Sequence, residues 1–140
     1  MTIAVDFDGT IVTHKYPAIG KEIPFAIETL VKLQEEGHRI VLWSVREGER
    51  LEEAVDYCHK RGLDFYAVNS EYPGASWSGS GVTRKIKADV YIDDCNLGGL
   101  PEWSSIYSMV TGKAGRRRKK KGLFAGLKDR CRRSREKFNR

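Results

Sequence analysis

Residues 3–12 read Ile3-Ala4-Val5-Asp6-Phe7-Asp8-Gly9-Thr10-Ile11-Val12, an apolar run that ends in two carboxylates, a glycine and a hydroxyl. The apolar part precedes a turn signal, which predicts a buried strand whose carboxyl end carries Asp6 and Asp8. Side chains two apart on a strand share a face, so we expect both carboxylates in one pocket and Phe7 in the packing. Neighbouring carboxylates repel each other, and burial strengthens the repulsion. The pair therefore needs a cation, a shared proton or a catalytic role, unless Asp8-Gly9 is an ordinary turn.

Length and composition fit one globular domain. The chain has 140 residues, 40% hydrophobic and 10% aromatic, enough for a hydrophobic core. No apolar run approaches the ~20 residues of a membrane span, and the N-terminus lacks a secretory signal, which predicts a cytoplasmic protein. The cysteines are Cys58, Cys95 and Cys131. They stand far apart without C-x-x-C spacing, which favours reduced thiols over a disulfide framework or a zinc site.

The net charge of +6 combines two regions of opposite sign. Residues 1–112 hold 11 Lys or Arg and 17 Asp or Glu, net −6, whereas residues 113–140 hold 14 and 2, net +12. The basic run over 116–121 is of a kind that is usually disordered, and the residues beyond it fit a narrow amphipathic helix. We therefore predict a domain over 1–112 and a basic, disordered or helical tail over 113–140. Such a tail suits a nucleic acid, an anionic membrane or another chain, or serves only for solubility.

Strands and helices alternate along the acidic region. The predicted strands cover 3–5, 39–43, 65–68 and 89–92, and the predicted helices cover 24–36, 47–61 and 103–110. This alternation predicts an α/β fold with a parallel sheet, and the nearly continuous apolar strands suggest helices on both faces, hence three layers. Ligands of such sheets bind beyond the carboxyl ends of the strands. The polar residues brought to that rim are Asp6, Asp8, Ser44, Asp93 and Asp94.

Four stretches resemble, in order, the four motifs of the haloacid dehalogenase (HAD) superfamily. The run from Asp6 to Thr10 resembles motif I, whose first Asp attacks phosphorus and whose second is the general acid and base. Ser44 resembles the motif II hydroxyl that binds a phosphoryl oxygen, although a serine there is also a common helix N-cap. Lys85 resembles the phosphate-binding lysine of motif III, with Lys87 as a competing candidate.

Asp93-Asp94 resembles motif IV, whose carboxylates hold Mg²⁺. Adjacent side chains on a strand face opposite ways, so Asp93 is the expected ligand and Asp94 lies on the metal or beyond it. The resemblance implies a Rossmann-like HAD core and a Mg²⁺-dependent phosphomonoester hydrolase that forms an aspartyl-phosphate on Asp6. The implied metal site is Asp6, Asp8, Asp93 and Asp94, and the implied phosphate site is Ser44, Lys85 and the backbone around Phe7.

The intervals between these motifs leave no room for a separate cap domain, so the chain resembles the small capless phosphatase-like branch. An open site suits large substrates or is covered by another subunit, which makes a homo-oligomer one expectation. Candidates for substrate contact are Arg46, Trp77 and His14. Trp77 is equally explained by packing on its own sheet, and a lone loop histidine such as His14 is usually solvated.

An alternative from another class is a nucleic-acid or membrane-surface binding protein on a HAD-like scaffold with little or no turnover. A third hypothesis joins the two, with a phosphatase brought to nucleic-acid ends by its basic tail. The Asp6 and Asp8 pair favours catalysis, because a binding module has no need of the second carboxylate.

Overall fold

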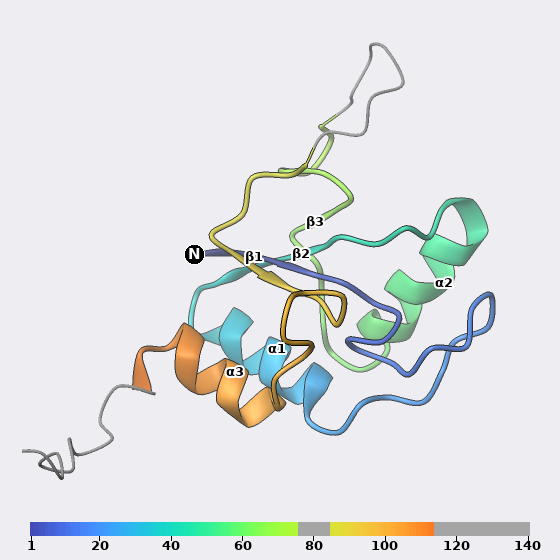
Figure 1. Cartoon of the computed structure of the whole chain (residues 1–140). Coiled ribbons are helices and arrows are strands. Elements are labelled where there is room, and N and C mark those ends of the chain that lie inside the picture. The colour runs from blue at the N-terminus through green and yellow to red at the C-terminus, as the bar shows by residue number, and fades with distance from the viewer. Residues whose placement is uncertain (76–84, 114–140) are drawn as a thin grey trace, which may run out of the picture.

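The structure is a computed structural model that describes residues 1–75 and 85–113 (Figure 1). The predictions for Trp77 and for the tail beyond Lys113 therefore lie outside the described residues. Among the described residues, none of the helices has the length and apolar character needed to cross a bilayer.

Four short strands form one parallel sheet. They are β1 (Thr2–Val5), β2 (Arg39–Leu42), β3 (Ala67–Val68) and β4 (Val90–Ile92). The strand order is β3-β2-β1-β4, and each neighbouring pair is parallel. The last residue of the central strand, Val5, is in register with Leu42 and Ile92. The segments that follow β1, β2 and β4 therefore leave the sheet at the same edge.

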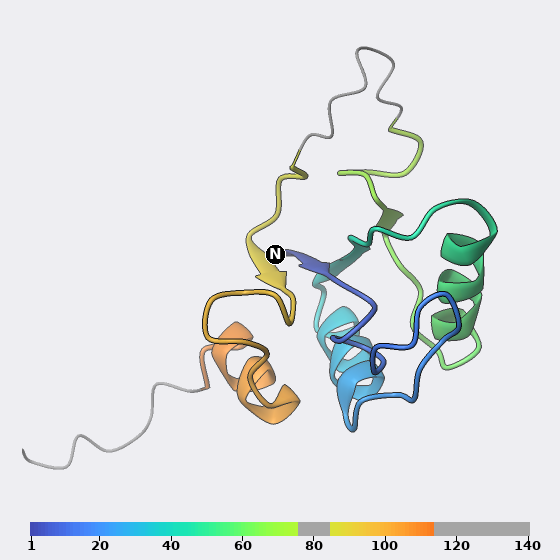
Figure 2. The ribbon, with the colours of Figure 1, turned by 45° about the vertical axis from the view of Figure 1, so that its right-hand side comes forward.

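Three helices complete the fold, namely α1 (Ala26–Glu35), α2 (Gly48–His59) and α3 (Trp103–Val110). Figures 1 and 2 show α1 and α3 side by side, with α2 apart from them. The prediction of an α/β fold with an all-parallel sheet is confirmed. The observed helices and strands differ from the predicted ones mainly at their ends. The first helix begins at Ala26 because Phe25 has a left-handed φ of 67°, and the third strand keeps only its last two residues.

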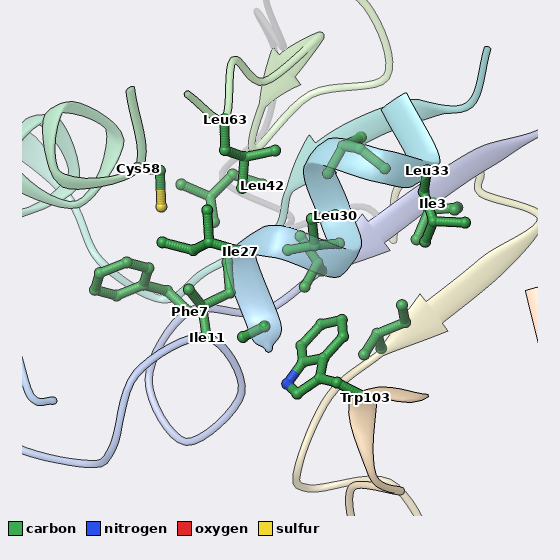
Figure 3. Packing of buried hydrophobic residues seen from close by; sticks show 14 of the residues in the cluster. Ile3, Phe7, Ile11, Ile27, Leu30, Leu33, Leu42, Cys58, Leu63 and Trp103 are labelled. Carbon is green, nitrogen blue, oxygen red and sulfur yellow. The ribbon is translucent and has the colours of Figure 1, made fainter. Parts of the chain in front are cut away.

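The main core lies between the helices and one face of the sheet (Figure 3). Alternate residues of β1, such as Ile3 and Val5, meet Leu30 of α1, Cys58 of α2 and Trp103 of α3 in one buried cluster. Burial of apolar surface of this kind contributes about 25 cal/mol per Å². All three helices thus supply their apolar faces to the same side of the sheet.

The opposite face of the sheet carries a smaller cluster. It is formed by Ala4, Val41 and Ala67 from the strands and Ile86 from the segment before β4. No described helix contributes to it, so the described residues form two layers of regular structure in place of the predicted three. This face is covered by Ile86 from the segment before β4, which is neither helix nor strand at that residue.

A short antiparallel pairing follows β1 and frames a loop over residues 14–20. The backbone N–H of Thr13 donates to the carbonyl of Lys21 at 2.8 Å, and Ile23 donates to Ile11 at 2.8 Å. The loop starts and ends beside the carboxyl end of β1, which places it next to the predicted rim.

Candidate functional site

A hollow of about 220 Å³ opens where β1 and β4 end. Its lining residues are Ala4, Asp6, Trp43, Lys85, Tyr91, Ile92, Asp93 and Asn96. Asp6 directly follows β1, and its backbone N–H donates to the carbonyl of Ile92 at 3.0 Å, which fixes it against the end of β4. The structure thus brings together Asp6, Asp93 and Lys85, three residues far apart in the sequence.

Asp6 lies in surroundings that disfavour its negative charge. The pKa of Asp6 is raised to about 6, mainly by burial; the charges of Asp93, Asp94 and Asp8 contribute to the rise, and a hydrogen bond from the Phe7 backbone opposes it. The hydroxyl of Thr10 lies 3.5 Å from Asp6 Oδ2. A carboxylate so placed is stabilised by any cation that enters the hollow.

Asp8 has a partner of its own, in contrast to the expectation that it shares a pocket with Asp6. Arg46 Nε donates to Asp8 Oδ2 at 2.6 Å, and Arg46 Nη2 donates to Asp8 Oδ1 at 2.8 Å. The Arg46 side chain has 0% exposure. Asp8 is not among the residues that line the hollow, because its side chain turns away toward this guanidinium.

The remaining Arg46 hydrogen bonds tie the pair to the 14–20 loop. Nη1 donates to the carbonyl of Pro17 at 3.1 Å, and Nη2 donates to that of Ala18 at 2.9 Å. The guanidinium also lies over the rings of Phe7 and Tyr16, at 5.1 and 5.2 Å from their centroids. Arg46 therefore joins the turn after β1 to the loop beside it, and its buried side chain is engaged with Asp8 and this loop.

The two carboxylates after β4 face different neighbours. Asp93 lines the hollow, and its Oδ1 accepts a hydrogen bond from the backbone N–H of Cys95 at 2.7 Å. Asp94 turns toward the 14–20 loop, where its Oδ2 lies 2.9 Å from His14 Nε2. The hydrogen bond that His14 donates to Asp94 is the main cause that raises the pKa of His14.

The oxygens at this rim are of the kind that hard divalent cations prefer. Asp94 Oδ1 is buried and has no hydrogen-bond partner among the described residues. Asp93, Asp94 and Cys95 can each place one ligand atom within 4.8 Å of the other two. A carboxylate oxygen that is buried without a donor is unfavourable unless a cation or water meets it, so the donor set fits Mg²⁺.

The turn after β1 is closed by the backbone of Phe7. Its carbonyl accepts hydrogen bonds from Ile11 at 3.0 Å and Val12 at 3.1 Å, while its ring is fully buried, as predicted. Gly9 has a φ of 89°, and a Cβ there would collide with His14 and Asp94. A side chain at this position would therefore be strained by its backbone conformation and would require His14 and Asp94 to shift.

Of the predicted phosphate-binding residues, Lys85 reaches the hollow and Ser44 lies outside its lining. Lys85 Nζ lies 4.4 Å from the Tyr91 ring centroid, while the backbone N–H of Lys87 donates to Glu71. Ser44 Oγ accepts a hydrogen bond from the backbone N–H of Arg46 at 3.2 Å. The serine hydroxyl thus holds the turn that carries Arg46.

Comparison with known proteins gives one match among solved structures. A conserved protein coded by a locus from Bacteroides thetaiotaomicron is 61% identical to this chain, with a TM-score of 0.74. The match covers 81% of this chain and 91% of the other. No family description and no curated protein matches the chain.

Proposed function

The chain belongs to the same family as the conserved protein from Bacteroides thetaiotaomicron, and we propose that it is a Mg²⁺-dependent phosphomonoester hydrolase acting through an aspartyl-phosphate. The observation that carries the proposal is the gathering of Asp6, Asp93 and Lys85 around one hollow at the ends of β1 and β4. In this proposal the α/β domain is a capless HAD core, in line with the motif resemblance of Asp6-Phe7-Asp8-Gly9-Thr10.

The proposed nucleophile is Asp6. Its carboxylate attacks the phosphorus and forms an acyl phosphate, which splits the hydrolysis into two easier displacements. Lys85 supplies positive charge to the phosphoryl oxygens from the same hollow. Ser44 is proposed to reach the phosphate only if its hydroxyl turns from the Arg46 amide, and the backbone around Phe7 would add N–H donors.

The metal would be held by Asp6, Asp93 and the free Oδ1 of Asp94, with Asp8 contributing its backbone oxygen. When bound, Mg²⁺ neutralises the repulsion between an anionic phosphate and the carboxylates around it. Asp8 is the proposed proton-transfer group, and Arg46 holds both of its side-chain oxygens in place.

Phosphate release from a panel of sugar phosphates, nucleotides, phosphoamino acids, aryl phosphates and acyl phosphates tests this proposal. We expect release that requires Mg²⁺ and that falls by at least about 10³-fold in Asp6→Asn. Glu53→Gln is the matched control, since Glu53 is an exposed carboxylate paired with Arg50 on α2. Release by Asp6→Asn at the wild-type rate would reject Asp6 as the nucleophile.

A second candidate function is polyanion binding through the +12 region over 113–140, on a domain with little turnover. Polyanion binding is favoured by the opposite net charges of residues 1–112 and residues 113–140. Neutralising the six basic residues 116–121 to Gln in the full chain should weaken binding to single-stranded DNA or anionic vesicles and flatten its salt dependence. No phosphate release from any substrate, together with such binding, would favour this candidate over the phosphatase.

A further inference from the structure

A second hollow of about 340 Å³ lies beside the candidate site, between β4 and α3. Figure 2 shows β4 and α3 on the same side of the molecule, joined by the loop over residues 93–102. Within the described sheet β4 pairs with β1 alone, so the hollow lies at the outer edge of the sheet. The apolar residues that line it include Val90 of β4, Leu97, Leu100 and Pro101 of the loop, and Ile106 and Met109 of α3.

Two large apolar side chains of this lining are exposed. Leu97 is fully exposed, and Met109 is 54% exposed. Leu97 stands at the corner of a turn closed by a hydrogen bond from the Gly99 N–H to the Asn96 carbonyl at 2.8 Å. Gly98 supplies the left-handed φ of 92° that such a turn requires. Exposed apolar side chains gathered around one hollow are typical of a binding surface, because they do not fill the core.

The apolar hollow is continuous with the smaller hollow that contains Asp6. The residues that line both are Tyr91, Ile92, Asp93 and Asn96. Asn96 Nδ2 donates to the Tyr91 carbonyl at 3.3 Å, which holds this side chain at the edge of β4 on the border between the two. Asp6 and Lys85 line only the smaller hollow, and among the described residues that line the larger one only Asp93 is charged. A molecule bound at Asp6 therefore has charged groups around it and an apolar surface next to it.

Resting on the proposed phosphatase function, we infer that the hollow between β4 and α3 holds the alcohol part of the substrate, and that the substrates are phosphate monoesters of apolar alcohols. The phosphoryl group lies in the smaller hollow, facing Asp6 and Lys85. The alkyl or aryl part crosses the border at Asn96 and lies against Leu97 and Met109.

The lining also discriminates against polar alcohols. Each methylene group placed on this surface leaves water, which favours binding. The hydroxyl groups of a sugar phosphate or of glycerol phosphate would meet side chains such as Leu97, Leu100 and Met109, which offer no strong hydrogen-bond partner. Polar groups that lose water without a new partner weaken binding.

A series of alkyl phosphates tests the inference with the full-length wild-type protein and Mg²⁺. It uses ethyl, butyl and hexyl phosphate, each below the concentration at which it forms micelles, and glycerol phosphate as the polar comparison. We expect kcat/KM to rise by roughly threefold for each added methylene, as expected for apolar surface that leaves water. We expect glycerol phosphate to be hydrolysed no better than ethyl phosphate. Equal kcat/KM values across the alkyl series would overturn the inference.

Two variants show whether this hollow is the surface that the alkyl chain contacts. Leu97→Asn and Met109→Gln place amides in the lining, and each should lower the ratio of kcat/KM for hexyl phosphate to that for ethyl phosphate by about tenfold. Phe25→Asn is the matched control, because Phe25 is 65% exposed, lies outside both hollows and has a left-handed φ that Asn adopts. This control should keep the wild-type ratio. An unchanged ratio in both lining variants would place the alkyl chain elsewhere and reject the assignment. If circular dichroism shows that the lining variants do not fold, the wild-type series decides.

The same measurements separate this inference from the proposed function. Release that depends on Mg²⁺ and Asp6 but does not change with chain length rejects only the substrate class. Absence of release from every ester, or release that persists in Asp6→Asn, rejects the phosphatase and the inference with it.

Discussion

Asp6 and Asp8 lie two residues apart after β1, and their surroundings differ in every respect. Both oxygens of Asp8 accept hydrogen bonds from a buried guanidinium. Asp6 lies near Asp93 and Asp94, and within residues 1–75 and 85–113 no Lys or Arg makes an ion pair with it. A charge balanced by a side chain belongs to the fold, while a charge without a counterion remains open to a ligand. The same residue type is thus paired with a buried cation at one position and left without a counterion at the other.

The largest expected effect is a loss of stability at Asp8, the carboxylate that is paired with Arg46. Asp8→Asn leaves the buried Arg46 charge without a counterion, so the free energy of unfolding should fall by about 3–5 kcal/mol. Urea denaturation followed by circular dichroism measures this change. A double variant, Asp8→Leu with Arg46→Met, removes both charges and should be more stable than Asp8→Asn. A loss below about 1 kcal/mol for Asp8→Asn would mean that the ion pair is not part of the folded ground state.

The next largest loss of stability is expected at Gly9, in the turn after β1. Gly9→Ala combines a left-handed φ of 89° with a collision against His14 and Asp94. Gly37→Ala is the matched control, with a φ of 87° and no atom within 4 Å of the added Cβ. The control should cost about 1 kcal/mol, and Gly9→Ala should cost at least about 1 kcal/mol more in urea denaturation. Equal costs would show that His14 and Asp94 yield freely to the methyl group.

Asp6→Asn, the same substitution at the carboxylate without a counterion, should raise the free energy of unfolding, whereas Asp8→Asn lowers it. The pKa of Asp6 rises from 3.8 to about 6 in the folded protein, so between these pH values the folded state binds more protons than the unfolded state. The free energy of unfolding contributed by Asp6 is therefore present below pH 3.8 and is lost as the pH rises to about 6.

Asp6→Asn removes the free-energy cost of the charged Asp6 side chain in the folded state. Without metal at pH 8, it should stabilise the protein by about 1–2 kcal/mol, a figure reduced for the partial exposure of Asp6. Thermal denaturation in EDTA at pH 8 and pH 4 measures the difference, which should vanish at the lower pH. If Asp6→Asn is instead less stable than the wild type at pH 8, Asp6 must have a counterion that the structure does not show.

The smallest effect is a titration shift at His14. Its pKa is raised by the hydrogen bond that it donates to Asp94, so Mg²⁺ that engages Asp94 should lower the pKa of His14. Proton NMR of the histidine ring, with and without Mg²⁺, detects the shift. His59 is the control, because its pKa is raised by Asp64 on a surface remote in sequence from the rim. Equal shifts at both histidines would indicate a general salt effect.

The strands of the sheet were predictable from the sequence because each apolar run lies within a few consecutive residues. The apolar runs before Asp6, Ser44 and Asp93 each contain a strand, and the rule that ligands bind beyond parallel strand ends was sufficient to bring Asp6 and Asp93 together. The layers were harder to predict. A buried apolar strand is compatible with a helix or an extended segment over its second face, and here Ile86 covers it without a helix among the described residues.

The ion pair at Asp8 was not predictable from spacing. Asp8 and Arg46 are 38 positions apart, and an arginine in a loop is usually exposed. The local sequence points the other way, because apolar Val45 is 90% exposed while its charged neighbour Arg46 is buried. The pairing of His14 with Asp94, 80 positions apart, is equally a product of the tertiary fold.

The position of β1 in the middle of the sheet also bears on synthesis at the ribosome. β1 is made first, yet its two neighbours end at Leu42 and Ile92. The strand that carries Asp6 must therefore wait for most of the domain to emerge before both of its edges are paired. During that interval β1 can pair with β2 on one edge only, so the nascent chain keeps an unpaired strand edge until β4 has left the exit tunnel.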